Sequence, residues 1–151
     1  MSEIRVLIRR LDHYPVDWPL PEYATPGSAG VDLRNAGPEV VIPPLGRVLI
    51  PTGLSIALPI GTEAQVRPRS GLAFRRGIGI PNAPGTIDSD YRGELCVPLI
   101  NYDGEAQCIA HGERIAQLVL AKVERIAWEP VAELPADSVR GDGGFGSTGR
   151  H

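Results

Sequence analysis

Prolines and glycines divide this chain into short apolar segments, and this division limits the possible folds more than any other feature. The prolines stand between the segments or at their edges, where a missing N–H does not interrupt a hydrogen-bond ladder. Many short strands separated by turns are typical of a β-sandwich or β-barrel. We therefore expect an all-β, jelly-roll-like β-barrel whose strands come from segments 4–10, 39–43, 47–51, 53–58, 63–68, 94–102 and 106–110.

The composition supports one such domain. The chain has 151 residues, 42% of them hydrophobic and only 5% aromatic, so the core must consist mainly of Val, Ile, Leu and Ala. We expect the barrel to span residues 1–139. The segment 140–151 is rich in glycine and carries a single large apolar side chain, Phe145. It cannot form a core of its own, so we expect a flexible tail that closes over a site when a ligand binds.

Two segments do not fit a strand as readily. Residues 70–77 begin with Ser70, a good N-cap residue, and end at Gly77, which predicts a single short helix. Residues 113–127 are compatible either with a helix or with one long strand, and periodicity alone does not decide between them.

Charge and cysteine usage exclude several classes of protein. A net charge of −3 provides no general basic field, so we expect no binding to nucleic acid. No apolar run is long enough to cross a membrane, and we expect a soluble cytoplasmic protein. Cys96 and Cys108 lie in no metal or redox motif, and we expect buried free thiols. The histidines are isolated, so no metal-ligand cluster is visible.

Two clusters of hydrogen-bond donors could bind an anion. In the tail, Arg140, Ser147 and Thr148 accompany glycines whose backbone N–H groups can converge on a phosphate, and Phe145 offers a flat face for a base; the alternative is a disordered terminus. In segment 67–77, Arg69 and Ser70 precede or open the expected helix. For the two arginines that follow, Arg75 and Arg76, we expect solvated side chains.

Three aspartates are candidates for acid–base chemistry. Asp32, Asp88 and Asp90 stand in turns rich in Gly or Pro, where Asp most often bonds its own backbone. Asp88 differs because it ends the apolar turn 85–87 and precedes Tyr91. Desolvation in a water-poor turn raises the pKa of a carboxyl group, so Asp88 is the candidate general base.

Five segments, read together and in order, resemble the five motifs of the trimeric deoxyuridine triphosphate nucleotidohydrolases (dUTPases). They are GSAGVDLRN at 27–35, RPRSGLAFRRG at 67–77, NAPGTIDSDYRGE at 82–94, GERIAQLVLAKVE at 112–124 and RGDGGFGSTGR at 140–150. Their joint occurrence in this order is far more specific than any single glycine pattern.

The resemblance implies a jelly-roll-like β-barrel with one short helix, assembled as a homotrimer whose active sites lie between subunits. It favours a strand for residues 113–127. The implied activity is that of a dUTP diphosphatase, which hydrolyses dUTP to dUMP and diphosphate with the help of Mg2+. Such an enzyme limits uracil in DNA and supplies dUMP for dTMP synthesis.

The resemblance also assigns roles to single residues. Asp88 would activate the water that attacks the α-phosphorus, and Gln117 would help to hold this water and the α-phosphate. Asp32 would touch the metal through its water shell, as suits Mg2+, which is held mostly by substrate phosphates. The contacts to the phosphate chain would come from Arg69, Ser70 and Gly71.

The remaining roles concern the nucleoside and the tail. Tyr91 would pack on the deoxyribose and leave no room for a 2′-hydroxyl. The uracil would be read by Asn82 and the backbone of Gly85, Thr86 and Ile87. The tail would clamp the substrate through Arg140, Phe145, Gly146, Ser147 and Thr148.

Two other functions remain open. A dCTP deaminase shares the fold, but that family places a glutamate base at the position that Pro98 occupies here, and it lacks this tail. A nucleotide-sensing module could keep the fold without catalysis, although the intact Asp88 argues against this.

Overall fold

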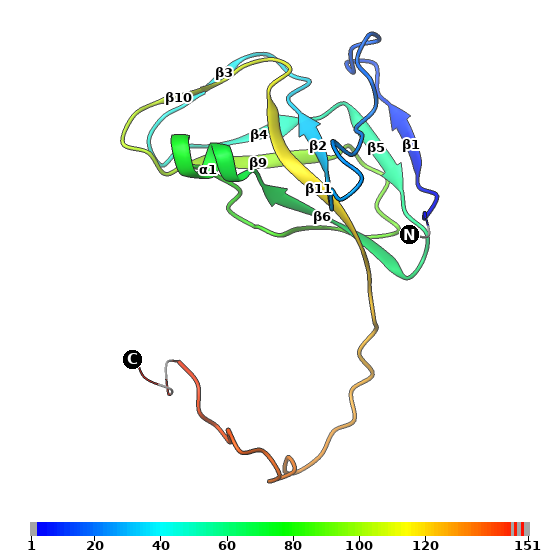
Figure 1. Cartoon of the computed structure of the whole chain (residues 1–151), viewed down its shortest axis with the longest axis vertical. Coiled ribbons are helices and arrows are strands. Elements are labelled where there is room, and N and C mark those ends of the chain that lie inside the picture. Colours follow the sequence, from blue (N-terminus) through cyan, green and yellow to red (C-terminus); the bar gives the residue numbers. More distant parts are fainter. Residues whose placement is uncertain (1–2, 146, 148, 150–151) are drawn as a thin grey trace.

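Short antiparallel strands make up the body of the molecule, and one short helix lies against them (Figure 1). The computed structural model describes residues 3–145, 147 and 149. In chain order the elements are β1 (Leu7–Arg10), β2 (Val31–Arg34), β3 (Val40–Ile42), β4 (Arg47–Pro51), β5 (Leu54–Ala57), β6 (Thr62–Pro68), α1 (Ser70–Arg76), β7 (Ile78–Gly79), β8 (Gly85–Ile87), β9 (Cys96–Asn101), β10 (Gln107–Ile109) and β11 (Arg114–Lys122).

The strands pair in small sheets that connect distant parts of the sequence. One sheet has the order β2-β11-β6-β8 and another has the order β4-β9-β7, while β1 pairs with β5 and β3 pairs with β10. Every pairing is antiparallel. Because β11 lies between β2 and β6, it brings the first, second and fourth of the motif-like segments together in one sheet.

Alternation along the strands builds the core. In β6 the side chains of Thr62, Ala64 and Val66 point inward, and those between them are more exposed. The same two-residue period buries Val97 and Leu99 on β9. The core consists of aliphatic side chains from all the sheets, as the low aromatic content predicts; it includes Leu33, Ile42, Ile50, Leu54, Leu95, Ile109 and Ile115.

The all-β prediction and most of the expected strands are confirmed. The structure also contains three strands that the sequence analysis does not predict. These are β2, β7 and β8, which are two to four residues long and too short to show a period. Segment 113–127 is a strand, β11, but it ends at Lys122. A change of register between Arg114 and Ala116 lets the adjacent residues Ile115 and Ala116 both face the core.

The predicted helix is present as α1, with a corrected start. Arg69 is the N-cap residue and Ser70 is already helical, so Ser70 makes no side-chain cap. Gly77 ends the helix in the left-handed region, with φ of 60°. A Cβ there would lie 2.8 Å from the backbone nitrogen of Asp103, so both conformation and space require glycine.

The expectation of two buried thiols is wrong for Cys108, which is exposed on β10, whereas Cys96 is partly buried. Burial raises the pKa of the Cys96 thiol, and the Glu94 carboxylate raises it further. Both cysteines are free.

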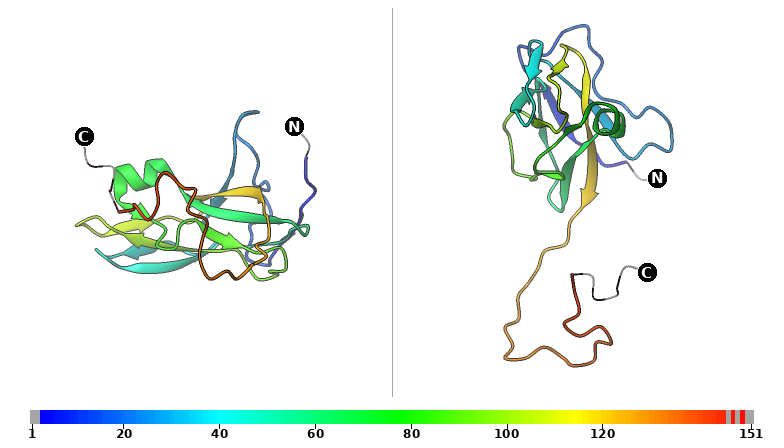
Figure 2. Two further views of the ribbon diagram at one scale, coloured as in Figure 1. Left: turned by 90° about the horizontal axis from the view of Figure 1, so that it is seen from below. Right: turned by 90° about the vertical axis from the view of Figure 1, so that its left-hand side faces the viewer.

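After Lys122 the chain leaves the barrel in an extended course (Figures 1 and 2). Residues 123–139 are exposed and contain neither helix nor strand. In the described part of the chain, no helix has the length and apolarity that crossing a membrane requires.

Candidate functional site

A cavity of about 560 Å³ lies where β2, β11 and α1 meet. Five of its lining residues carry charged or amide side chains that the sequence analysis names: Asp32, Arg69, Arg75, Arg76 and Gln117. The complete lining is Glu22, Ala24, Ser28, Ala29, Gly30, Asp32, Arg69, Ser70, Gly71, Leu72, Arg75, Arg76 and Gln117. The cavity therefore unites the expected phosphate-binding residues of three separate motifs.

Asp32 is held by two arginines. Its Oδ1 lies 3.1 Å from Arg69 Nε, and its Oδ2 lies 3.3 Å from Arg114 Nη1. The Asp32 side chain is 27% exposed, so solvent screens these ion pairs only in part. The carboxylate fixes both guanidinium groups beside the cavity, where they supply positive charge for an anion.

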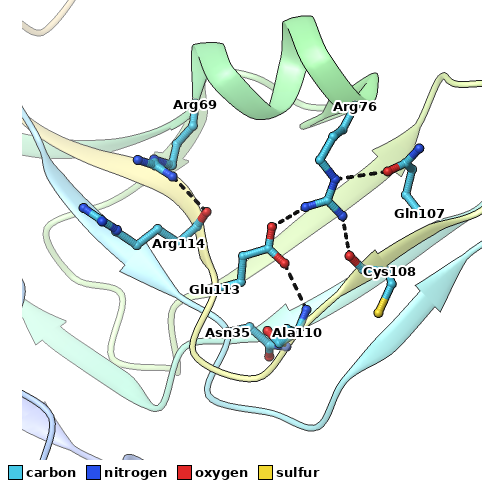
Figure 3. Close-up of polar contacts among 8 residues, drawn as sticks. All are labelled: Asn35, Arg69, Arg76, Gln107, Cys108, Ala110, Glu113 and Arg114. Atoms are coloured by element: carbon cyan, nitrogen blue, oxygen red, sulfur yellow. Dashed lines mark hydrogen bonds and ion pairs between the residues drawn. The ribbon is translucent and has the colours of Figure 1, made fainter.

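Ser70 and Gly71 line the same cavity at the start of α1. Both residues are exposed, and nothing lies within 4 Å of the position that a Cβ of Gly71 would take. The backbone of this turn is therefore open to a ligand. Arg69 anchors this turn to β11, because its Nη1 donates to the main-chain oxygen of Arg114 at 3.2 Å (Figure 3).

Gln117 lies on β11, directly opposite Asp32 of β2 and Arg67 of β6. The Gln117 Nε2 is 3.4 Å from the main-chain oxygen of Pro68. Its amide is partly exposed and lines the cavity. This amide can therefore turn toward a phosphate or a water without leaving a buried group unpaired.

Asp88 stands apart from this cavity. It follows Ile87, which pairs with Ala64 of β6, whereas Arg69 follows the other end of β6. At about 3.3 Å per residue, the chain from Ala64 to Arg69 separates the two ends by roughly 16 Å. None of residues 82–91, all of them described, lines the cavity.

The environment predicted for Asp88 is wrong for the single chain. Asp88 is exposed rather than in a water-poor turn. Its main-chain oxygen accepts a hydrogen bond from the Tyr91 amide at 3.2 Å, which closes the turn between them. Desolvation of this carboxylate would have to come from a ligand or from another copy of the chain.

The turn that carries Tyr91 is well anchored. The Tyr91 hydroxyl donates to the main-chain oxygen of Glu94 at 2.9 Å. The Glu94 carboxylate accepts from Gly53 N at 2.7 Å and lies 2.6 Å from His13 Nε2. The Tyr91 ring is 43% exposed, so one face is free to contact a sugar.

Asn82 lies beside the short strand β8. A Cβ placed on Gly85 would lie 3.4 Å from Asn82 Nδ2 and 3.3 Å from Val66 Cβ. Gly85 is buried, Ile87 is half-buried and Thr86 is exposed. The segment 82–91 therefore forms one compact unit at the β8 edge of the sheet.

The tail lies outside both regions. Phe145 is fully exposed, and Arg140 Nε donates to the nearby main-chain oxygen of Gly143 at 2.7 Å. Ser147 N donates to Gly144 O at 3.0 Å, which closes a turn. Gly146 and Thr148 lie outside the described residues.

The sequence reasoning missed two residues that the fold brings to this site. Arg114 pairs with Asp32. The one signal in the sequence was its position three residues before Gln117. Arg76 was expected to be solvated, but it forms an ion pair with Glu113 at the border of the cavity (Figure 3). Both are surface-type residues whose partners lie far away in the sequence.

The donor set suits Mg2+ only if substrate phosphates supply most of its ligands. Within residues 3–145, 147 and 149, no cluster of three or more His, Cys, Asp or Glu side chains could hold a metal. Asp32 is a hard oxygen donor at the cavity, and its arginine partners leave room for a contact through water. Mg2+ usually keeps several waters and binds few protein carboxylates, so these residues fit it.

Comparisons with known proteins point to one family. A sequence model of the dUTPase family matches residues 16–149. The chain is 53% identical over 152 residues to the deoxyuridine 5′-triphosphate nucleotidohydrolase of Maricaulis maris (strain MCS10), with 99% of each chain covered. It is 56% identical over 132 residues to the enzyme of that name from Anaplasma marginale (strain St. Maries), with 87% of this chain and 89% of the relative covered.

Solved structures show the same fold. A mutant dUTPase of Staphylococcus bacteriophage 80alpha with dUpNHpp superposes with a TM-score of 0.82 at 25% identity, covering 97% of this chain and 99% of the other. A mutant dUTPase from phage phi11 of S. aureus, described with a structural Mg(II) ion, has a TM-score of 0.72 at 22% identity and covers 85% of this chain and 97% of the other.

Proposed function

The chain belongs to the dUTPase family, and on this basis we propose that it hydrolyses dUTP to dUMP and diphosphate. The observation that carries the proposal is the cavity that unites Asp32, Arg69, Ser70, Gly71 and Gln117. It combines the Arg69 guanidinium group, which is held by Asp32, with an open backbone turn and a partly exposed amide, and these groups together suit a chain of phosphates. Hydrolysis of a phosphate anhydride depends on neutralising charge and on positioning the reactants more than on a covalent intermediate.

Asp88 is the general base in this proposal. A carboxylate that is exposed in the free chain and then covered by substrate and protein can take a proton from the attacking water. Gln117 holds the α-phosphate and the same water, and Ser70 binds the phosphate chain beside it. The attack forms the bond between the water oxygen and the α-phosphorus and releases diphosphate.

Specificity for deoxyuridine comes from the unit 82–91. Asn82 and the backbone of Gly85, Thr86 and Ile87 pair with the uracil edge. The free face of the Tyr91 ring packs on the deoxyribose and excludes a 2′-hydroxyl. The bonds that anchor Tyr91 and Glu94 hold this face in place before substrate arrives.

The active site is shared between copies of the chain, which assemble as a homotrimer. The separation of the two regions in one chain supports this, because the backbone from Ala64 to Arg69 spans roughly 16 Å and no residue of 82–91 lines the phosphate cavity. Cyclic assembly would bring the β8 edge of one copy to the phosphate cavity of the next. Exposed apolar side chains after β11 provide surface for such contacts; they are Ile126, Trp128, Val131 and Leu134.

The tail completes the site. Arg140 and Ser147 would donate to the γ-phosphate, and Phe145, which is fully exposed, would cover the uracil. Gly146 and Thr148 belong to the same clamp in this proposal. An ordered tail excludes water from the site once the substrate is bound. In this proposal the chain has two functional parts: residues 1–139, which comprise the barrel and the extended segment after Lys122, and the tail at 140–151.

Mg2+ is the proposed cofactor. Bound to the triphosphate, it would neutralise negative charge on the phosphates. Asp32 would orient it through a water molecule, and no other carboxylate is required for this role. The proposed location, the cytoplasm, is where a nucleotide pool would supply the substrate.

The experiment that tests the function is a diphosphate-release assay on dUTP, UTP, dTTP and dCTP. We expect release from dUTP alone. Ammonia from dCTP would favour the deaminase, which Pro98 opposes, because a proline on β9 facing Leu49 cannot transfer a proton. Binding of dUTP without any release would favour the sensing module.

A further inference from the structure

The short helix α1 carries part of the phosphate site but is weakly held by apolar packing. It has seven residues, and Leu72 is its one buried residue. Phe74, on the same helix, is 93% exposed. One apolar contact can fix the distance of a helix from a sheet, but not its rotation, so other contacts must orient α1.

Arg76 supplies such contacts at the end of α1. All three nitrogens of its guanidinium group have partners: Nε donates to Gln107 Oε1 at 3.0 Å, Nη2 donates to the main-chain oxygen of Cys108, and Nη1 pairs with Glu113 Oε1 (Figure 3). Arg76 and Glu113 are only 30% and 22% exposed, so water screens the pair in part. The planar guanidinium therefore ties the last turn of α1 to β10 and to the β10–β11 turn.

Besides its pair with Arg76, Glu113 accepts hydrogen bonds from two other residues. Its Oε2 accepts from Ala110 N at 2.9 Å, and its main-chain oxygen accepts from Asn35 N at 2.9 Å. Asn35 is fully buried and directly follows β2, the strand of Asp32. The partner of Arg76 is thus built into the frame that also positions Asp32.

The two ends of α1 are held by consecutive residues of the same segment. Arg69, before the helix, donates to the main-chain oxygen of Arg114, and Arg76, at its end, pairs with the side chain of Glu113. Figure 3 shows the two arginines reaching down from opposite ends of the helix. Between these attachments lie Ser70 and Gly71, which face the phosphate cavity.

We propose that the Arg76–Glu113 pair is a positioning pair that sets the orientation of α1 for binding the phosphate chain of the substrate. The pair acts through Ser70 and Gly71. The inference rests on the proposed function, because it takes the ligand to be a nucleoside triphosphate. It assigns to Arg76 and Glu113 a role in the preference for a triphosphate chain over a single phosphate.

The test compares two ligands that share the nucleoside and differ in the number of phosphates. Binding of dUpNHpp and of dUMP is measured for the wild type, R76A, E113A and the double variant, at a temperature at which each is fully folded by circular dichroism. A misplacement of about 1 Å in a binding group can cost up to about a hundredfold. We expect dUpNHpp to bind about tenfold more weakly to R76A, with dUMP changed less than twofold.

Three further variants separate positioning from general stability. R76K keeps the charge but presents one nitrogen, so it should lie between R76A and the wild type. The double variant should be no worse than R76A, since R76A already removes the contact that E113A breaks. Arg47→Ala, an exposed arginine of β4 outside the cavity lining, is the matched control and should bind both ligands like the wild type.

Equal weakening of dUMP and dUpNHpp, unchanged binding of dUpNHpp, or additive losses in the double variant would overturn the proposal. If R76A and E113A do not fold, R76K and Gln107→Ala decide it on the same ratio of affinities. If the wild type binds no deoxyuridine nucleotide, the proposed function fails instead. The pair is then tested with inorganic triphosphate, which should bind about tenfold more weakly to R76A if the positioning role holds.

Discussion

The two halves of the candidate site differ in how far a single chain organises their side chains. At the phosphate cavity, Asp32 forms ion pairs with Arg69 and Arg114. Asp32 and Arg114 lie on the neighbouring strands β2 and β11, and Arg69 directly follows β6 of the same sheet. At the β8 edge, Asp88 is exposed and lies roughly 16 Å away along β6. One half is thus organised within a single chain, whereas in the proposed function the other half and the tail depend on assembly and on substrate.

The difference follows from charge. Arginines that bind a polyanion can form ion pairs with a carboxylate while the site is empty. These pairs hold the arginines in place before the ligand binds. A general base has no such partner and must remain free to take a proton. If Asp88 is the general base, its desolvation would therefore come last, from the ligand and from another copy of the chain.

Asp88→Asn should have the largest effect. An amide cannot accept the proton of the attacking water, and loss of a general base costs about 10²- to 10⁴-fold in rate. We expect diphosphate release from dUTP to fall by about three orders of magnitude, while dUpNHpp binding changes little. Asp90→Asn, an exposed neighbour in the same turn, is the matched control. An active Asp88→Asn enzyme would show that another group activates the water.

Removal of residues 140–151 should have the next largest effect. Without the tail, the bound substrate loses the proposed donors Arg140 and Ser147 and remains open to water. We expect kcat to fall by about 10²-fold, as for loss of preorganised donors in other sites. The melting temperature should not change, because the described tail residues make no contact with the core. A control lacking only residues 150–151 should stay active, and full activity of the longer truncation would refute the clamp.

Mixing inactive subunits should test the separation of the two halves directly. Asp88→Asn has an intact phosphate cavity, and Arg69→Ala has an intact Asp88 turn. If each site takes one half from each of two copies, unfolding and refolding an equal mixture should restore about one quarter of wild-type activity, the chance of pairing two intact halves. Each variant refolded alone is the control. Failure to recover activity, with mixed oligomers present by mass spectrometry, would place both halves of a site in one chain.

Much of this could be read from the sequence because it depends on local rules. Prolines at segment edges and aliphatic alternation predicted an all-β barrel, and Gly77 predicted where α1 ends. The motif residues Asp32, Arg69 and Gln117 were named as one group from their resemblance to a family, and the fold does bring them together. These features could be predicted because each is decided by a few neighbouring residues or by a motif that can be recognised in the sequence.

Other features depended on partners far away in the chain. For segment 113–127, periodicity allowed a helix or a strand, and pairing with β2 and β6 decides for the strand. Arg76 reads as a solvated residue until the fold places Glu113 and Cys108 beside it, and Cys108 reads as buried until β10 proves to be an edge strand. The sequence by itself therefore determined the type of fold and the chemical groups of the site. Only the tertiary structure decided which of these groups are paired and which are exposed, because long-range contacts set burial and charge pairing.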